Sequence, residues 1–162
     1  MAPENAKRIL AEAELIHSAA AVNAAIEHLA TDITARLQDA HPLVLTVMGG
    51  AVIFAGQLLP QLAFPLECDY VHATRYGKGT SGGDLKWLKE THVSVTGRTV
   101  LVLDDILDEG ITLAAIRCRL LEQGAAMCLT AVLADKQIGR SKPIAADFVG
   151  LPLPDRYVFG CG

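Results

Sequence analysis

Apolar residues recur at two different spacings along the 162-residue chain, and the change from one to the other predicts the order of its elements. In the N-terminal part they stand three or four residues apart, so we expect helices over residues 5–20 and 21–39. Later they form short continuous runs, which are typical of strands buried on both faces of a parallel sheet. These runs cover residues 43–48, 99–104 and 127–134.

Glycine and proline mark where these elements end. Gly49 and Gly50 follow the first run, and Pro60 ends a helix predicted over residues 51–59; a further helix is predicted over 112–123. Strands and helices therefore alternate, which predicts an α/β fold with a mainly parallel twisted sheet flanked by helices, in a single domain over residues 1–162. The remaining predictions are β-like segments over 66–74, 148–150 and 157–159, a hairpin partner over 85–95 and a long loop from 135.

Composition narrows the classes of function. Hydrophobic residues make up 51% of the chain and the net charge is −4, so a real core is expected and nucleic-acid binding is not. No apolar run reaches about 18 residues, so we expect no membrane span. The four cysteines lie far apart, the N-terminus does not resemble a secretory signal, and a soluble cytoplasmic protein is expected.

The stretch after the apolar run 99–104 carries the strongest chemical signal. Asp104 and Asp105 lie where a buried strand should end, and burying two acids is costly unless a ligand, metal or donor offsets it. Residues 108–112 then lead into a helix whose first N–H groups can hold phosphate. A solvated strand end and an ordinary capped helix are the structural alternatives for the two segments taken separately.

Three further candidates stand near other strand ends. Gly49-Gly50 can form a concavity of backbone donors, although chain reversal is commoner for two glycines alone. Lys136 follows a buried strand, where a cation reaches a cleft, although a lone lysine is usually solvated. Phe148 and Val149 fit a core pair, or an aromatic stacking on a flat base.

Together these residues resemble a known family. The run Val102-Leu103-Asp104-Asp105-Ile106-Leu107-Asp108-Glu109-Gly110-Ile111-Thr112-Leu113 resembles the 5-phosphoribosyl-1-pyrophosphate (PRPP) signature of the type I phosphoribosyltransferases. Lys136, Asp147-Phe148-Val149-Gly150 and Pro154-Asp155-Arg156-Tyr157-Val158-Phe159-Gly160 are similar to the 6-oxopurine subtype, the hypoxanthine-guanine type. The resemblance implies transfer of phosphoribose from PRPP to hypoxanthine or guanine, giving a nucleoside monophosphate and pyrophosphate.

The resemblance also implies roles for individual residues. Asp104 and Asp105 would bind the ribose hydroxyls, directly or through hydrated Mg²⁺, and Asp108 would accept the proton from N7 of the base. The 5′-phosphate would be held by Asp108, Glu109, Gly110, Ile111 and Thr112.

Other implied roles concern the base, the pyrophosphate and closure of the site. Lys136 would donate to O6, Phe148 would stack on the purine, and Val149 would offer backbone contacts. Asp155 would bind a second Mg²⁺, and Gly49 and Gly50 would form the pyrophosphate loop. Residues 75–84, with Arg75 and Tyr76, would form a flexible hood, and a homodimer or homotetramer is expected by analogy.

Four features depart from the family pattern. Met48 stands where Lys is common, Arg75 where Ser or Thr is usual in the hood, and Glu109 where Thr is common. The sequence closes on Gly160-Cys161-Gly162, whereas relatives continue with an Asp-Tyr-containing segment and an Arg that meets pyrophosphate. On that comparison, we expect the C-terminal part to be shortened.

Three alternatives remain. One is a transferase of the same superfamily for xanthine or another base, which the residues between Lys136 and Val149 would decide. Another is a nucleotide-sensing RNA-binding regulator on the same fold, against which the acidic net charge argues. A receiver-like domain with an acidic phosphoacceptor pocket fits the Asp-Asp-x-x-Asp-x-Gly-x-Thr run poorly.

Overall fold

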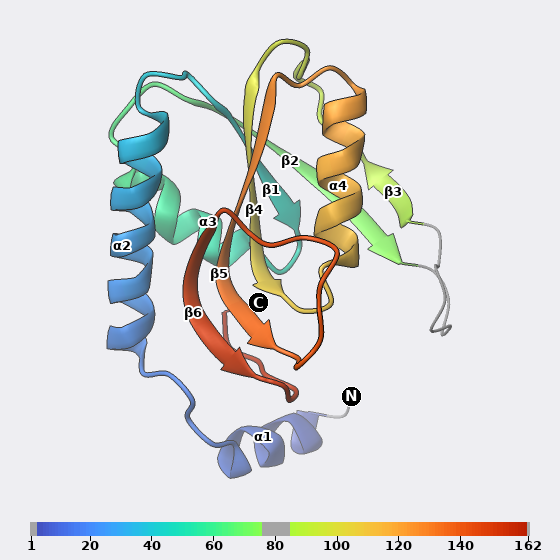
Figure 1. The fold of residues 1–162 in the computed structure, drawn as a ribbon. Coiled ribbons are helices and arrows are strands. Elements are labelled where there is room, and N and C mark those ends of the chain that lie inside the picture. The colour runs from blue at the N-terminus through green and yellow to red at the C-terminus, as the bar shows by residue number, and fades with distance from the viewer. Residues whose placement is uncertain (1–2, 76–84, 162) are drawn as a thin grey trace.

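The computed structural model describes residues 3–75 and 85–161, which form a six-stranded sheet in the order β3-β2-β1-β4-β5-β6 (Figure 1). All neighbouring strands are parallel except the antiparallel pair β2 and β3. The mainly parallel sheet confirms the predicted α/β class. The strands are β1 (Leu43–Met48), β2 (Glu67–Arg75), β3 (Leu85–Lys89), β4 (Thr99–Leu107), β5 (Met127–Gln137) and β6 (Phe148–Pro154).

Helices cover both faces of this sheet. The long α2 (Ala19–Leu37) and the short α3 (Val52–Leu58), which continues into the 3-10 turn η1 (Leu59–Gln61), lie on one face, and α4 (Ile111–Glu122) lies on the other (Figure 1). The N-terminal α1 (Pro3–Glu12) lies near the lower ends of β5 and β6 in the same view.

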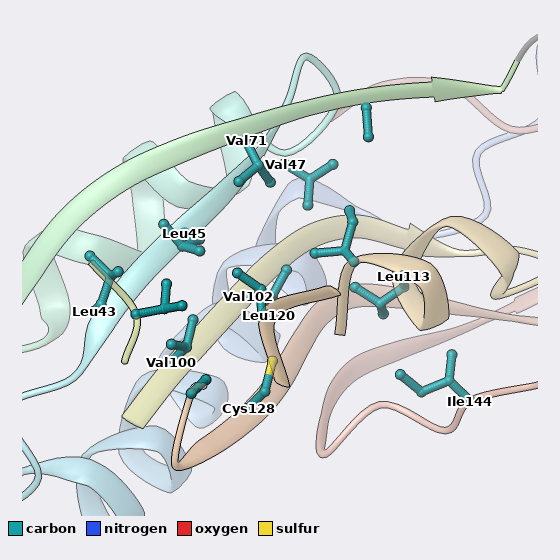
Figure 2. Close-up of a cluster of buried hydrophobic side chains, with 14 of the residues drawn as sticks. Leu43, Leu45, Val47, Val71, Val100, Val102, Leu113, Leu120, Cys128 and Ile144 are labelled. Carbon is teal, nitrogen blue, oxygen red and sulfur yellow. The ribbon is translucent and has the colours of Figure 1, made fainter. Parts of the chain in front are cut away.

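Side chains of the central strands alternate between two hydrophobic cores. On β4, Val100 and Val102 belong to the core under α4, shown in Figure 2, while Leu101 and Leu103 belong to the core under α2 and α3. All four are fully buried, and burying such a side chain contributes about 1.5–3 kcal/mol. Because helices cover both faces of the sheet, the sequence of each central strand is a continuous apolar run and does not alternate between apolar and polar residues.

Several element boundaries differ from the predictions. The two N-terminal helices exist, but the break falls before Ser18, whose hydroxyl caps α2 by accepting from the Ala21 N–H at 3.2 Å. β4 and β5 continue three residues beyond their apolar runs, because β4 pairs with β5 as far as Leu107 and Asp135 and β5 pairs with β6 as far as Gln137. The predicted strand over 157–159 was wrong, since that segment has no strand partner.

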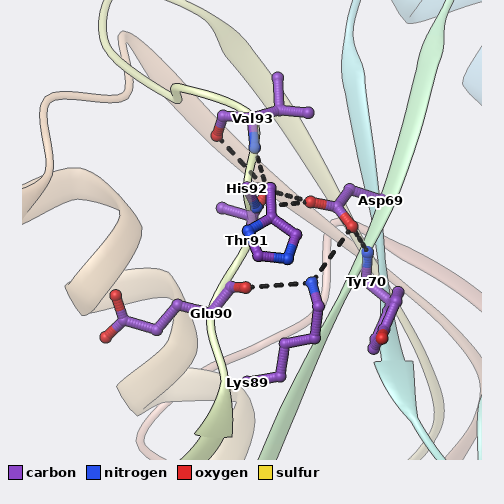
Figure 3. A network of polar contacts seen from close by, with 7 residues as sticks. All are labelled: Asp69, Tyr70, Lys89, Glu90, Thr91, His92 and Val93. Atoms are coloured by element: carbon purple, nitrogen blue, oxygen red, sulfur yellow. Dashed lines mark hydrogen bonds and ion pairs between the residues drawn. The ribbon is translucent and has the colours of Figure 1, made fainter.

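The chain after β3 is held to β2 by a polar network around Asp69 (Figure 3). The Asp69 carboxylate accepts hydrogen bonds from the Thr91 hydroxyl and the His92 N–H, both at 2.7 Å, and from the Tyr70 N–H at 2.8 Å. Lys89 lies 3.5 Å from the same carboxylate and 4.0 Å above the Tyr70 ring. These bonds fix the start of the connection from β3 to β4.

Within residues 3–75 and 85–161, no helix combines the length and the apolar character that crossing a bilayer needs.

Candidate active site

The predicted site residues gather where β1, β4 and β5 end. These three strands are adjacent and parallel, so their carboxyl ends meet at one edge of the sheet, the usual place for ligands in open α/β sheets (Figure 1). Gly49 and Gly50 follow β1, Asp104 and Asp105 lie near the end of β4, and Lys136 lies near the end of β5. The strands therefore bring three of the predicted groups to one place.

Gly50 lies directly against Asp105. A Cβ atom added to Gly50 would stand 2.6 Å from the Asp105 Cγ, whereas nothing lies within 4 Å of one added to Gly49. The Met48–Gly49 peptide bond is cis. Only glycine therefore lets the turn after β1 approach the carboxylate at the end of β4.

Asp104 and Asp105 are two neighbouring half-buried acids that lie inside β4, whereas the sequence predicted them at the end of a strand over residues 99–104. The Asp105 N–H donates to the Asp104 carboxylate at 3.0 Å. Burial raises the pKa of Asp104 well above its usual range, and the neighbouring Asp105 charge raises it further. Among the residues that the structure describes, neither carboxylate has a lysine or arginine ion-pair partner.

This acid pair suits a hydrated Mg²⁺ ion. Mg²⁺ usually keeps several waters and binds one or two carboxylates together with substrate phosphates, instead of an all-protein cage. The described part of the chain contains no group of three or more His, Cys, Asp or Glu side chains that could hold a metal. The two acids offer oxygen ligands, and their unbalanced charge favours a cation.

The start of α4 presents open backbone donors. Gly110 is the N-cap at φ 79°, a conformation that favours glycine, and no side chain caps the helix. The prediction that Thr112 starts the helix was therefore slightly late, since α4 begins at Ile111. The uncapped N–H groups and the helix dipole make this end attractive to an anion.

Lys136 and Asp108 face each other across the ends of β5 and β4. The Lys136 ammonium donates to the Asp108 carboxylate at 2.8 Å, and the lysine side chain is only 11% exposed against 49% for the aspartate. Lys136 lies within β5, not beyond it as predicted. Sequence reasoning selected both residues separately but did not anticipate that they pair.

The loop between β5 and β6, residues 138–147, contributes two basic residues that sequence reasoning missed. Arg140 donates to Glu109 at 2.7 Å, so the extra acid at position 109 is balanced by a neighbouring cation.

Lys142 donates to the Leu107 and Lys136 carbonyls and to Asp135. The loop borders a cavity of about 470 Å³. The available signal is the pair of basic residues, Arg140 and Lys142, in the long loop predicted from residue 135.

Phe148 and Val149 do not reach the site, which corrects their predicted contact with a purine. Phe148 pairs with Ala131 and Val149 with Val132, four to five residues before Lys136 on the neighbouring strand. At about 3.3 Å per residue, Phe148 lies about 16 Å along the sheet from Lys136. Its ring instead packs against the core under α2, so the core alternative holds for it.

The opposite end of β6 does reach the site edge. Leu153 pairs with Lys136, so the residues after β6 continue from the same edge as the acid pair. They include Tyr157, which is 83% exposed, with its ring centroid 6.3 Å from that of Phe159. Asp155 is exposed in the same segment. The available signal is a tyrosine shortly after a strand, but its β-like neighbours predict a strand there instead of a free aromatic ring.

The predicted hood falls almost wholly outside the described residues. Residues 76–84, including Tyr76, are not described, and Arg75 is known only as the last backbone position of β2.

Comparisons with known proteins identify the family of the chain. The phosphoribosyl transferase domain family matches residues 12–162. The hypoxanthine-guanine phosphoribosyltransferase of Bacillus subtilis is 36% identical over 138 residues, which are 85% of this chain and 77% of that protein. The hypoxanthine-guanine-xanthine phosphoribosyltransferase of Tritrichomonas foetus is 34% identical over 85% of this chain and 75% of that protein.

Solved structures show the same relationship. A crystal structure of a hypoxanthine phosphoribosyltransferase from Staphylococcus aureus superimposes with a TM-score of 0.86 at 25% identity, covering 92% of this chain and 82% of that one. The structural match covers most of both chains, and the family domain spans nearly all of the sequence. The chain therefore belongs to the phosphoribosyltransferase domain family.

Proposed function

We propose that the protein transfers the phosphoribosyl group of PRPP to hypoxanthine or guanine, giving IMP or GMP and pyrophosphate in purine salvage. The observation that carries this proposal is the meeting of three groups at one sheet edge: the acid pair of β4, the open N-terminus of α4 and the Lys136–Asp108 pair. The activities in the names of the Bacillus and Tritrichomonas relatives support it.

The sugar phosphate binds between β4 and α4. The uncapped N–H groups at the start of α4, with the Thr112 hydroxyl, hold the 5′-phosphate, and Gly110 permits the close approach. Asp104 and Asp105 hold the ribose hydroxyls, and Gly49 and Gly50 face the pyrophosphate. Mg²⁺ held at the two acids would supply positive charge to the departing pyrophosphate.

The purine binds on the β5 side of the phosphate. The Lys136 ammonium donates to O6, and the Asp108 carboxylate, 2.8 Å from that ammonium, accepts the proton from N7. N9 then forms its bond to C1′ as the bond from C1′ to the pyrophosphate oxygen breaks. In place of Phe148, the exposed Tyr157 beyond the end of β6 is the aromatic ring suited to stack on the base.

Several finer features belong to the same proposal. Asp155 is retained as a ligand for a second Mg²⁺ because it lies exposed beyond β6, at the site edge. Closure of residues 75–84, association into a homodimer or homotetramer and a cytoplasmic location stay predictions. Xanthine is a second candidate base, because the Tritrichomonas relative is named for it.

An absorbance assay with PRPP, Mg²⁺ and each purine in turn tests the proposal. Turnover with hypoxanthine or guanine is expected, and its absence in a folded protein would refute the proposal. Turnover with xanthine would establish the second candidate.

The Asp108→Asn substitution tests the assigned proton acceptor. It should lower kcat by about a hundredfold or more, since general base catalysis typically contributes that much. The KM for PRPP should stay within about twofold, because phosphate binding uses backbone donors. The matched control is Asp32→Asn on the exposed side of α2, which should leave kcat unchanged. Unchanged turnover of the Asp108 variant would show that another group accepts the proton.

A further inference from the structure

Lys142 has the surroundings of a buried structural cation, although it lies on a loop. Its side chain is 12% exposed. An ammonium group has three N–H donors, and Lys142 has three acceptors: the Leu107 carbonyl and the Lys136 carbonyl at 2.6 Å and the Asp135 carboxylate at 2.5 Å. Every donor of this group is therefore used within the protein, unlike those of a solvated surface lysine.

The three acceptors join two strands at the point where their ladder stops. Leu107 and Asp135 are the last paired residues of β4 and β5. By bonding to the carbonyls of Leu107 and Lys136, Lys142 extends the connection between the strands beyond that pair. Leu107 directly precedes Asp108, and Lys136 carries the ammonium that contacts Asp108.

Two weaker contacts accompany this connection. Arg140 pairs with Glu109, but the two side chains are 65% and 37% exposed, so solvent and salt screen their attraction. Ile144 packs near Gly110, where an added Cβ would meet its Cγ2 at 3.2 Å. Lys142 is thus the buried polar link between the loop and the strand ends.

We propose that Lys142 is a positioning residue, which fixes the distance between the purine-binding end of β5 and the phosphate-binding turn after β4. The inference rests on the proposed function. The turn after β4 continues directly into α4, which packs on the sheet, whereas the end of β5, beyond its last pair with β4, is paired with β6 alone and continues into the loop 138–147. Loss of Lys142 therefore displaces Lys136 more than it displaces the phosphate site. Binding of the purine base is weakened more than binding of PRPP.

The test is a double-mutant cycle between Lys142→Met and Lys136→Met. In the wild-type background, Lys142→Met should raise the KM for hypoxanthine about tenfold and leave the KM for PRPP within about twofold, because coupled residues commonly interact at that level. In the Lys136→Met background, it should cause no further rise, because the residue through which it acts is already gone.

Asp135→Asn is a second, milder variant, and it carries the test if Lys142→Met does not fold. It keeps an acceptor oxygen but removes the charge partner, so about a threefold rise in the KM for hypoxanthine is expected, again absent in the Lys136→Met background. Ile33→Val is the control for lost stability, since it loosens the core under α2 without contacting the loop.

Two results would overturn the inference. One is an equal rise of the KM for hypoxanthine in both Lys136 backgrounds, and the other is a matching rise of the KM for PRPP. Either would show that Lys142 serves only the fold. A folded wild-type protein without turnover would refute the proposed function itself, and this inference with it.

Discussion

Aspartates on two strands of the same sheet have opposite surroundings. Asp69 of β2 accepts hydrogen bonds from Thr91, Tyr70 and His92 and lies beside Lys89 (Figure 3). Burial alone would raise the pKa of Asp69, but the hydrogen bonds and the lysine outweigh it and hold that pKa well below the usual range. The chain itself thus supplies the hydrogen-bond donors and the positive charge that stabilise this carboxylate.

The acid pair of β4 is the reverse case. Burial and the charge of Asp105 raise the pKa of Asp104, and within the described ranges no lysine or arginine forms an ion pair with either acid. The comparison teaches how to separate the two roles of a buried carboxylate. Asp69 is satisfied by its own chain and supports the fold, whereas Asp104 and Asp105 require hydroxyls or a cation from a ligand.

Replacing both acids of the pair should have the largest effect on activity. The double variant Asp104→Asn with Asp105→Asn should lose about a thousandfold in kcat/KM for PRPP, because it removes the preorganised charge that holds the ribose and the cation. The unfolding temperature should not fall, since the like charges are gone and an amide oxygen at position 104 can still accept from the backbone N–H of position 105. Steady-state kinetics and thermal unfolding measure the two quantities.

The same contrast shows how much of the protein can be predicted from sequence. Continuous apolar runs and glycine turns predict the parallel sheet, since burial on both faces leaves that pattern in the residues themselves. They also place Asp104, Asp105 and Gly110, because these stand beside a strand and a helix start. The predicted strands were too short, because polar residues such as Asp135 and Lys136 continue a ladder when their side chains find partners.

What sequence could not predict is contact across strands. The assignment of Phe148 failed because the register between β5 and β6 places it far from Lys136 along the sheet. The sequence around Lys142 does not indicate that its ammonium group donates to carbonyls on two strands. Such contacts depend on the arrangement of the finished sheet and have no local sequence pattern.

The second way to sharpen the comparison is Asp69→Asn. An amide nitrogen cannot accept the bonds that one carboxylate oxygen takes from Thr91 and His92, so the free energy of unfolding at pH 7 should fall by about 2 kcal/mol. The KM for PRPP should not change. A kinetic defect in the folded variant would mean that Asp69 also serves the site and would break the comparison.

A smaller effect is expected from Gly50→Ala. The added Cβ would stand 2.6 Å from the Asp105 Cγ, so either the turn or the carboxylate must move, and we expect a cost of about 1 kcal/mol, at the low end for overpacking because a side-chain end can shift. Gly56→Ala is the control, because nothing lies within 4 Å of a Cβ there and alanine favours the helix. Chemical denaturation should show opposite signs for the two variants. Equal stability would mean that the acid pair is not confined by the turn.

The smallest effect concerns the pH dependence of stability. Because the pKa of Asp69 is lowered in the folded state, its contribution is fully present above the unfolded pKa of about 3.9 and is lost as the pH falls further toward the folded pKa. The difference in unfolding free energy between wild type and Asp69→Asn should therefore be constant from pH 7 to about 5 and shrink below about 4. Denaturant titrations across this range measure it, with Asp32→Asn expected to follow the wild type throughout. If the difference in unfolding free energy stayed the same at low pH, the network would not be stabilising the charge of the Asp69 carboxylate. The contrast between Asp69 and the acid pair would then depend on packing alone.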